Sequence, residues 1–91
     1  PEALSRKVLS KAFDISSRKF IDAFVEALPK LPRSEIEWRF HFMLGTMFYT
    51  MADSGRIQAL TSGRIDPGNV KRALQSMIPF LAAGFRSAPV S

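Results

Sequence analysis

Residues 39–53 read RFHFMLGTMFYTMAD, and this stretch decides the fold because a helix built from it is apolar around most of its circumference. A surface helix needs only one apolar stripe, so two apolar faces predict a second layer of protein, a ligand or a membrane. We interpret one face as internal core: Ile36, Phe40, Met43, Leu44, Met47 and Met51. The second face mixes aromatic and small residues, as paired surfaces do: Trp38, His41, Phe42, Gly45, Phe48, Tyr49 and Ala52.

The composition favours one folded domain, residues 1–91. Hydrophobic residues make up 46% of the chain and charged residues 23%, which is too apolar for a disordered protein. A chain of this size buries only about 60–65% of its unfolded surface, so we expect it to need a partner for stability. It has no Cys. The absence excludes a disulfide framework and fits a reducing compartment, so we expect the cytoplasm.

The net charge of +5 raises the possibility of nucleic-acid binding, but the cations are scattered. Most occupy positions on the predicted solvated faces of helices: Arg6, Lys7, Lys11, Arg18, Lys19, Arg33, Arg39, Lys71, Arg72 and Arg86. No nucleic-acid-binding motif accompanies them. The longest nearly uncharged run, residues 40–52, is shorter than the about 20 apolar residues that cross a bilayer, so we expect no membrane span.

Helical periodicity throughout the chain, without sustained strand alternation, predicts an all-α fold of three to four helices. We expect a first helix over residues 3–12, a break near residues 13–16, and a second helix over residues 17–28. Pro29 and Pro32 should end it, because proline cannot donate a helical hydrogen bond. Ser34 and Glu37 have the spacing of a capping box, which predicts the start of a central helix that runs to Ala52.

The second half of the chain predicts one further turn and one long helix. The segment 53–55 should weaken the central helix, residues 56–60 should add a turn, and residues 61–63 should form a loop. Asp66 as the N-cap and Pro67 at the first helical position predict a last helix that ends near Arg86. Pro79 lies inside this helix and should bend it.

The last helix also has two apolar faces. One carries Val70, Leu74, Ile78, Leu81 and Phe85, and the other carries Ala73, Met77, Phe80 and Gly84. Pairing the last two helices with the same helices of a second copy would cover every face, which predicts a homodimer with a four-helix bundle. The predicted dimer interface is His41, Gly45, Phe48, Ala52, Ala73, Met77, Phe80 and Gly84. The alternative is that these residues pack on the N-terminal helices of their own chain.

The sequence shows no pattern typical of catalysis or metal binding. His41 is the only histidine, and no carboxylate stands at a ligand-like spacing from it. We interpret it as an interface or core residue, with a hydrogen bond to a ligand as the alternative. Glu37 and Asp66 have capping roles, and neither a nucleophile elbow nor a phosphate loop is present. We therefore expect no enzyme, no cofactor and no metal.

Three segments together carry a family resemblance. They read Ala27-Leu28-Pro29-x-Leu31-Pro32, Glu35-x-x-Trp38-Arg39-x-His41-Phe42-x-x-Gly45, and Pro79-Phe80-Leu81-Ala82-Ala83-Gly84-Phe85-Arg86. On these segments, residues 17–86 resemble the C-terminal part of a TetR-family bacterial transcriptional regulator. The resemblance implies a repressor whose N-terminal helix-turn-helix binds operator DNA, while the helical C-terminal region dimerises and senses a small apolar effector.

The resemblance also implies places for the dimer and the effector. The family's two dimerisation helices correspond to residues 35–52 and 67–86, and its effector cavity lies among the preceding helices and one side of the first of these two. The implied cavity lining is Phe13, Phe20, Phe24, Trp38 and Phe42, which can equally be interpreted as plain core. The helix-turn-helix is absent, so we expect a part of a longer regulator that contacts operator DNA only through the missing domain. Two alternatives remain open, a helical protein-protein adaptor without an effector and a lipid-surface binder.

Overall fold

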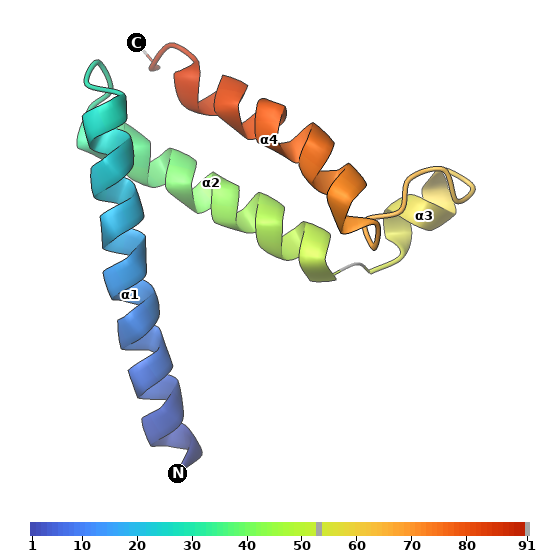
Figure 1. The fold of residues 1–91 in the computed structure, drawn as a ribbon, viewed down its shortest axis with the longest axis horizontal. Helices are drawn as coiled ribbons and strands as arrows, with labels where there is room; N and C mark the ends of the chain where they lie inside the picture. The colour runs from blue at the N-terminus through green and yellow to red at the C-terminus, as the bar shows by residue number, and fades with distance from the viewer. Residues whose placement is uncertain (53, 91) are drawn as a thin grey trace. The chain divides into compact units, whose positions relative to one another are not determined.

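The computed structural model describes residues 1–52 and 54–90, and over these residues the fold is all-helical, without a strand (Figure 1). The four helices are α1 (Glu2–Ala27), α2 (Arg33–Ala52), α3 (Arg56–Leu60) and α4 (Val70–Arg86). This confirms the predicted fold class and helix number. The chain divides into two compact units, a first unit of Pro1–Glu37 and a second unit of Trp38–Ser91.

The first unit contains one long helix where the sequence predicted two. α1 continues through residues 13–16, so the predicted break is wrong. The segment contains neither Gly nor Pro, and Asp14 and Ser16 alone do not stop a helix that already has hydrogen bonds on both sides. α1 ends at Ala27, and the Leu28 amide donates to the Phe24 carbonyl oxygen at 2.9 Å. Pro29 follows directly, as the sequence predicts.

α2 begins at Arg33, one residue before the predicted start. The carbonyl oxygen of Pro32 accepts from the amides of Glu35 and Ile36, at 3.0 and 3.2 Å. The predicted capping box of Ser34 and Glu37 is wrong, because Ser34 is already helical and the Glu37 carboxylate lies 3.6 Å from Arg33 Nε. The Pro32 carbonyl oxygen thus accepts the first hydrogen bonds of α2, and the Glu37 side chain pairs with Arg33 rather than with the Ser34 amide.

Burial falls along the core face of α2. Ile36 is fully buried and Phe40 is 7% exposed, whereas Met43 is half-buried and Met51 is 74% exposed. The core prediction for this face is therefore right at the start of α2 and wrong at its end. All residues of the second face of α2, from Trp38 to Ala52, are exposed in the single chain. Residue 53, where we expected the helix to weaken, lies outside the described residues.

α3 and the loop after it match the sequence prediction. α3 occupies Arg56–Leu60. Ser62 and Gly63 follow with positive φ angles of 54° and 82°, a conformation that reverses the chain after a helix. The sequence therefore located both the short turn of helix and the position of the chain reversal.

α4 begins three residues later than predicted. Asp66 Oδ1 accepts from the Gly68 amide at 2.9 Å, and the Asp66 carbonyl oxygen accepts from the Asn69 amide at 3.0 Å, so these residues form a turn. The N-cap is Asn69, whose Oδ1 accepts from the Arg72 amide at 3.2 Å. The predicted start at Pro67 is wrong because Gly68 favours the turn over the helix. Pro79 lies inside α4, which continues to Arg86.

Candidate functional site

Within the second unit, Arg39 joins the start of α2 to the end of α4. Its Nη1 donates to the carbonyl oxygens of Gly84, Phe85 and Ser87, at 3.0, 2.7 and 2.8 Å, and its Nη2 donates to that of Ala88 at 3.3 Å. The last carbonyls of a helix have no partner within the helix, and the helix dipole is negative at this end. One guanidinium therefore donates hydrogen bonds to carbonyls at the end of α4 and places a positive charge at the negative end of the helix dipole.

Arg39 is buried, with 8% of its surface exposed, so its predicted place on a solvated face is wrong. The physical reason is tertiary, because the carbonyls that accept its hydrogen bonds come from more than forty residues away in the sequence. Phe40, the next residue of α2, is 7% exposed. Phe85 of α4, whose carbonyl oxygen accepts from Arg39, is 6% exposed. We name Arg39, Phe40 and Phe85 the closed end of the second unit.

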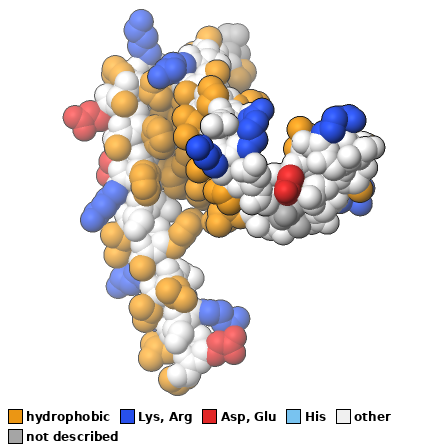
Figure 2. Space-filling model, turned by 45° about the vertical axis from the view of Figure 1, so that its right-hand side comes forward, with side chains coloured by type: hydrophobic (Ala, Val, Ile, Leu, Met, Phe, Trp, Pro, Cys, Tyr) orange, Lys and Arg blue, Asp and Glu red, His pale blue; other side chains and the backbone are white. Residues whose placement is uncertain are grey.

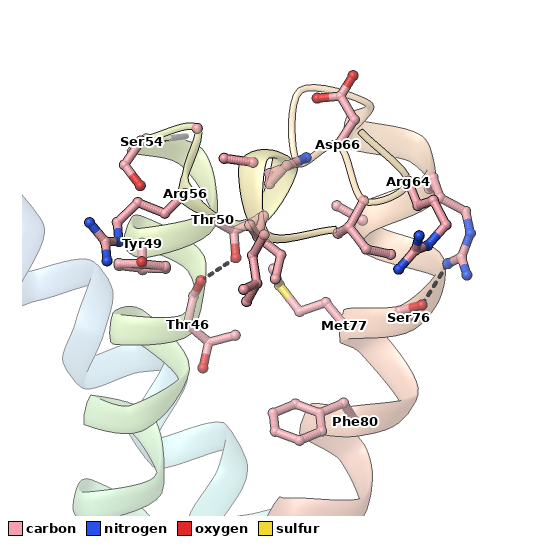
Figure 3. Close-up of a pocket in the computed structure, with 18 residues that line it drawn as sticks. Thr46, Tyr49, Thr50, Ser54, Arg56, Arg64, Asp66, Ser76, Met77 and Phe80 are labelled. Atoms are coloured by element: carbon pink, nitrogen blue, oxygen red, sulfur yellow. Dashed lines mark hydrogen bonds between the residues drawn. The ribbon is translucent and has the colours of Figure 1, made fainter. Parts of the chain in front are cut away.

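The opposite part of the second unit is hollow. A pocket of about 1210 Å³ lies between the second half of α2, α3 with its following loop, and the first half of α4 (Figure 3). Small-molecule sites usually measure roughly 300–1,000 Å³, so this volume is ample for one. We name it the α2–α4 pocket, and its surroundings the open end of the second unit.

The α2–α4 pocket combines apolar, hydroxyl and cationic side chains. Its apolar residues include Ile57, Leu60, Ile65, Met77 and Phe80, and its cations are Arg56, Arg64 and Arg72. The hydroxyls of Thr46 and Thr50 donate to carbonyl oxygens four residues earlier in α2, at 3.0 and 2.7 Å, so their protons are already used. This pocket could not be predicted from local sequence patterns, because its lining comes from three separate segments of the chain.

The predicted dimer-interface residues all lie in the second unit, on α2 and α4. His41, Gly45, Phe48 and Ala52 are exposed on α2, Phe80 and Gly84 are exposed on α4, and Ala73 and Met77 are half-buried. A Cβ atom added at Gly45 or Gly84 would meet nothing within 4 Å. The packing of the chain itself therefore does not require glycine at these two positions. The role of these residues as a dimer interface stays a prediction.

The predicted effector-binding residues fall in both units. Phe13 and Phe20 are exposed on α1 and Phe24 is half-buried there, all within the first unit. In the second unit, Trp38 and Phe42 stack with their ring centroids 5.9 Å apart and their planes at 28°. A cavity lined by all five residues stays a prediction.

His41 lies against these two rings. Its ring is edge-on to that of Trp38, with the centroids 6.2 Å apart, and 5.9 Å from that of Phe42. It is exposed, so it is not the core residue that one interpretation of the sequence offered. The other two interpretations, an interface residue and a hydrogen-bond partner of a ligand, both remain predictions.

Hydrophobic side chains cover much of the surface that faces the viewer in Figure 2. In the second unit, Trp38, Phe42, Phe48 and Tyr49 are each more than half exposed on α2, and Ile78 is 62% exposed on α4. Isolated apolar residues at a surface need no explanation, but contiguous patches beyond a few hundred Å² usually mark an interaction site. This exposure is the main structural feature that a function must explain.

A sequence model of the family described as "Tetracyclin repressor-like, C-terminal domain" matches residues 1–84. The chain belongs to this family. The match begins at residue 1, so it includes the part of α1 that the resemblance over residues 17–86 left out. Neither a curated protein nor a solved structure matches the chain. Domains of this TetR-like family belong to transcription regulators rather than enzymes. Among the described residues, no helix combines the length and apolarity needed to cross a membrane.

Proposed function

We propose that this chain is the dimerisation and effector-sensing part of a TetR-like transcriptional regulator that acts in the cytoplasm. DNA binding would reside in an N-terminal helix-turn-helix of the longer protein. Regulation would follow when effector binding here and operator binding there favour different conformations of the same dimer. Membership of the family supports this role, and the exposed apolar surface of the second unit supports the dimer.

The main support for the proposed dimer is the exposure of large apolar side chains on two neighbouring helices. Phe48 on α2 is 56% exposed and Phe80 on α4 is 69% exposed. Gly45 and Gly84 leave open space on the same helices, which lets another helix approach closely. A second copy offers the same surface, so a two-fold pairing into a four-helix bundle covers both.

The second part of the proposal is that the chain senses a small-molecule effector. The exposed aromatic residues Phe13 and Phe20 on α1, and the stacked pair of Trp38 and Phe42 on α2, could contact a small apolar molecule. The second candidate is a helical adaptor that binds another protein through the same aromatic face of α2. It is favoured only by the exposure of that face, which a protein partner would cover equally well.

The test is the molar mass in solution, measured by light scattering over a dilution series. We expect a dimer at micromolar concentration. The variant Phe48→Glu should raise the dimer dissociation constant at least a hundredfold, because it places a charge in the core of the interface. Phe48 is exposed within its own chain, so this variant should keep the helix content seen by circular dichroism.

The matched control is Val90→Glu. It also places a charge on an exposed apolar residue of the second unit, but outside the predicted interface. This variant should dimerise like the unmodified chain. A monomer in the unmodified chain would overturn the dimer and favour the adaptor, and equal weakening by both variants would remove Phe48 from the interface.

A further inference from the structure

The α2–α4 pocket carries three arginines that the proposed dimer does not use. Arg56 begins α3, Arg64 lies in the loop after it, and Arg72 lies in the first turn of α4. Figure 3 shows Arg64 on the α4 side of the pocket and Arg56 beside Tyr49 on the α2 side. Arg72 Nη1 donates to Ser76 Oγ, one turn further along α4, at 2.5 Å. Three separate segments thus each contribute one arginine to the lining of the pocket.

The charge of these arginines is not balanced within the described residues. Among the described residues, no ion pair includes Arg56, Arg64 or Arg72. Asp66 also lines the pocket, and its single negative charge offsets only one of the three arginines. By sequence, residues 38–91 contain six Lys and Arg against two Asp. The pocket therefore has an excess of positive charge, which favours an anionic occupant.

The apolar residues of the pocket favour an occupant with a hydrocarbon part. Leu60 is 80% exposed, Phe80 is 69% exposed and Ile65 is 51% exposed, although all three line a concave surface. An alkyl chain placed there would remove this apolar area from water. Guanidinium groups bind carboxylate and phosphate through paired hydrogen bonds, so the head group of such a molecule would meet the arginines.

We propose that the α2–α4 pocket binds a small amphiphile with an anionic head group, a carboxylate or a phosphate. The head group lies at Arg64 and Arg72, and the hydrocarbon chain lies against Ile57, Met77 and Phe80. The inference rests on the effector-sensing part of the proposed function, and it gives the effector a chemical class and a place apart from the predicted aromatic lining. DNA phosphates would meet the same arginines, but a concave pocket with apolar walls fits a small molecule better.

The test is isothermal titration of the chain with three decyl compounds below their micelle concentrations, and with inorganic phosphate. Decanoate and decyl phosphate should bind at least tenfold more tightly than decyltrimethylammonium, because only they carry the right charge. Inorganic phosphate should bind at least tenfold more weakly than decyl phosphate, because it lacks the hydrocarbon chain. Equal binding of the cationic compound, or of phosphate alone, would overturn the amphiphile.

The matched variants separate the pocket from the general positive charge. The double variant Arg64→Gln, Arg72→Gln should weaken decanoate binding at least tenfold. The control Lys71→Gln, Arg86→Gln removes the same charge from exposed residues outside the pocket and should bind decanoate like the unmodified chain. Equal loss in both variants would overturn the site, and so would a short DNA duplex that binds with the same dependence on Arg64 and Arg72.

The molar mass of each sample keeps this inference separate from the dimer. The pocket shares Ala73, Met77 and Phe80 with the predicted interface, so both properties are measured on the same solutions. A monomer that binds decanoate through Arg64 and Arg72 would support the pocket and overturn the dimer. A dimer that binds neither decanoate nor decyl phosphate would overturn the pocket and leave the dimer standing.

Discussion

The closed and open ends of the second unit join the same two helices in different ways. At the closed end, Phe40 and Phe85 are buried and Arg39 binds four carbonyl oxygens at the end of α4. At the open end, Met51 and Val70 are 74% and 64% exposed, and a pocket lies between the helices. The chain thus stabilises one end by its own contacts and leaves the apolar surface of the other unused.

This difference indicates which end offers a partner or ligand the larger favourable free energy of binding. Burying exposed apolar area contributes roughly 25 cal/mol per Å², and at the closed end the chain has already gained that free energy by folding. At the open end most of the apolar area is still exposed to water, so a partner or ligand that buries it can still gain this free energy. An open end is also free to change with its occupant, because a region with few buried contacts opens at low free energy. The proposed amphiphile site lies at this end, and the proposed dimer interface shares Ala73, Met77 and Phe80 with it.

A substitution that removes a buried side chain from the closed end should have the largest effect on stability. Phe85→Ala removes a ring that is 6% exposed, and we expect the free energy of unfolding to fall by about 4 kcal/mol. The control at the open end is Leu60→Ala, where the side chain is 80% exposed and the expected loss is below about 0.5 kcal/mol. Urea unfolding followed by circular dichroism at one protein concentration measures both. Equal losses would mean that the two ends do not differ.

Removing the charge from the closed end should have the next largest effect. Arg39→Met keeps an apolar stem but removes the guanidinium donor of the Phe85 and Ser87 carbonyls, whereas the Gly84 carbonyl keeps its hydrogen bonds from the Ser87 amide and hydroxyl. Buried acceptors that lose their partner cost about 1–3 kcal/mol each, less what water recovers, so we expect a loss of about 3 kcal/mol in urea unfolding.

Arg86→Met is the control for that loss. It removes an exposed arginine from the last turn of the same helix, and its expected effect is below about 0.5 kcal/mol. Arg39→Lys separates charge from shape, because one ammonium cannot reproduce the fork that reaches several carbonyls. A lysine variant as stable as the unmodified chain would show that charge alone holds the closed end.

The fold was largely predictable from local patterns. The stripe of Ile36 and Phe40 predicted the buried start of α2, and the position of Pro29 predicted the end of α1. Errors arose where two local signals competed. Asp66 and Pro67 predicted a helix start, but Gly68 allowed a turn, and Asn69 became the cap. Asp14 and Ser16 predicted a break that the hydrogen bonds of a long helix override.

The candidate site was much less predictable. Arg39 has the sequence context of a surface cation, and only the end of α4 reveals its partners. Arg56, Arg64 and Arg72 are each eight residues apart in the sequence but belong to three different segments, and the chain reversal at Ser62 and Gly63 places them around one pocket. Periodicity predicts which face of a helix is apolar. It does not predict which distant segment approaches that face, and both the closed and the open end depend on that approach.

The smallest of the three stability effects should arise at the open end itself, where local bonds hold the helix start. Asn69 Oδ1 accepts from the Arg72 amide at the first turn of α4. Asn69→Ala should lower the free energy of unfolding by about 1 kcal/mol, whereas Asn69→Asp should preserve it, because aspartate caps equally well and its charge suits the positive end of the helix dipole. Amide hydrogen exchange at Arg72 and Ala73 measures the local part of the loss. Because α4 is anchored at its far end by Arg39, the exchange should accelerate at these amides and stay unchanged near Phe85 in the alanine variant. Acceleration along the whole of α4 would instead show that the two ends open together, and the contrast between them would then be one of burial alone.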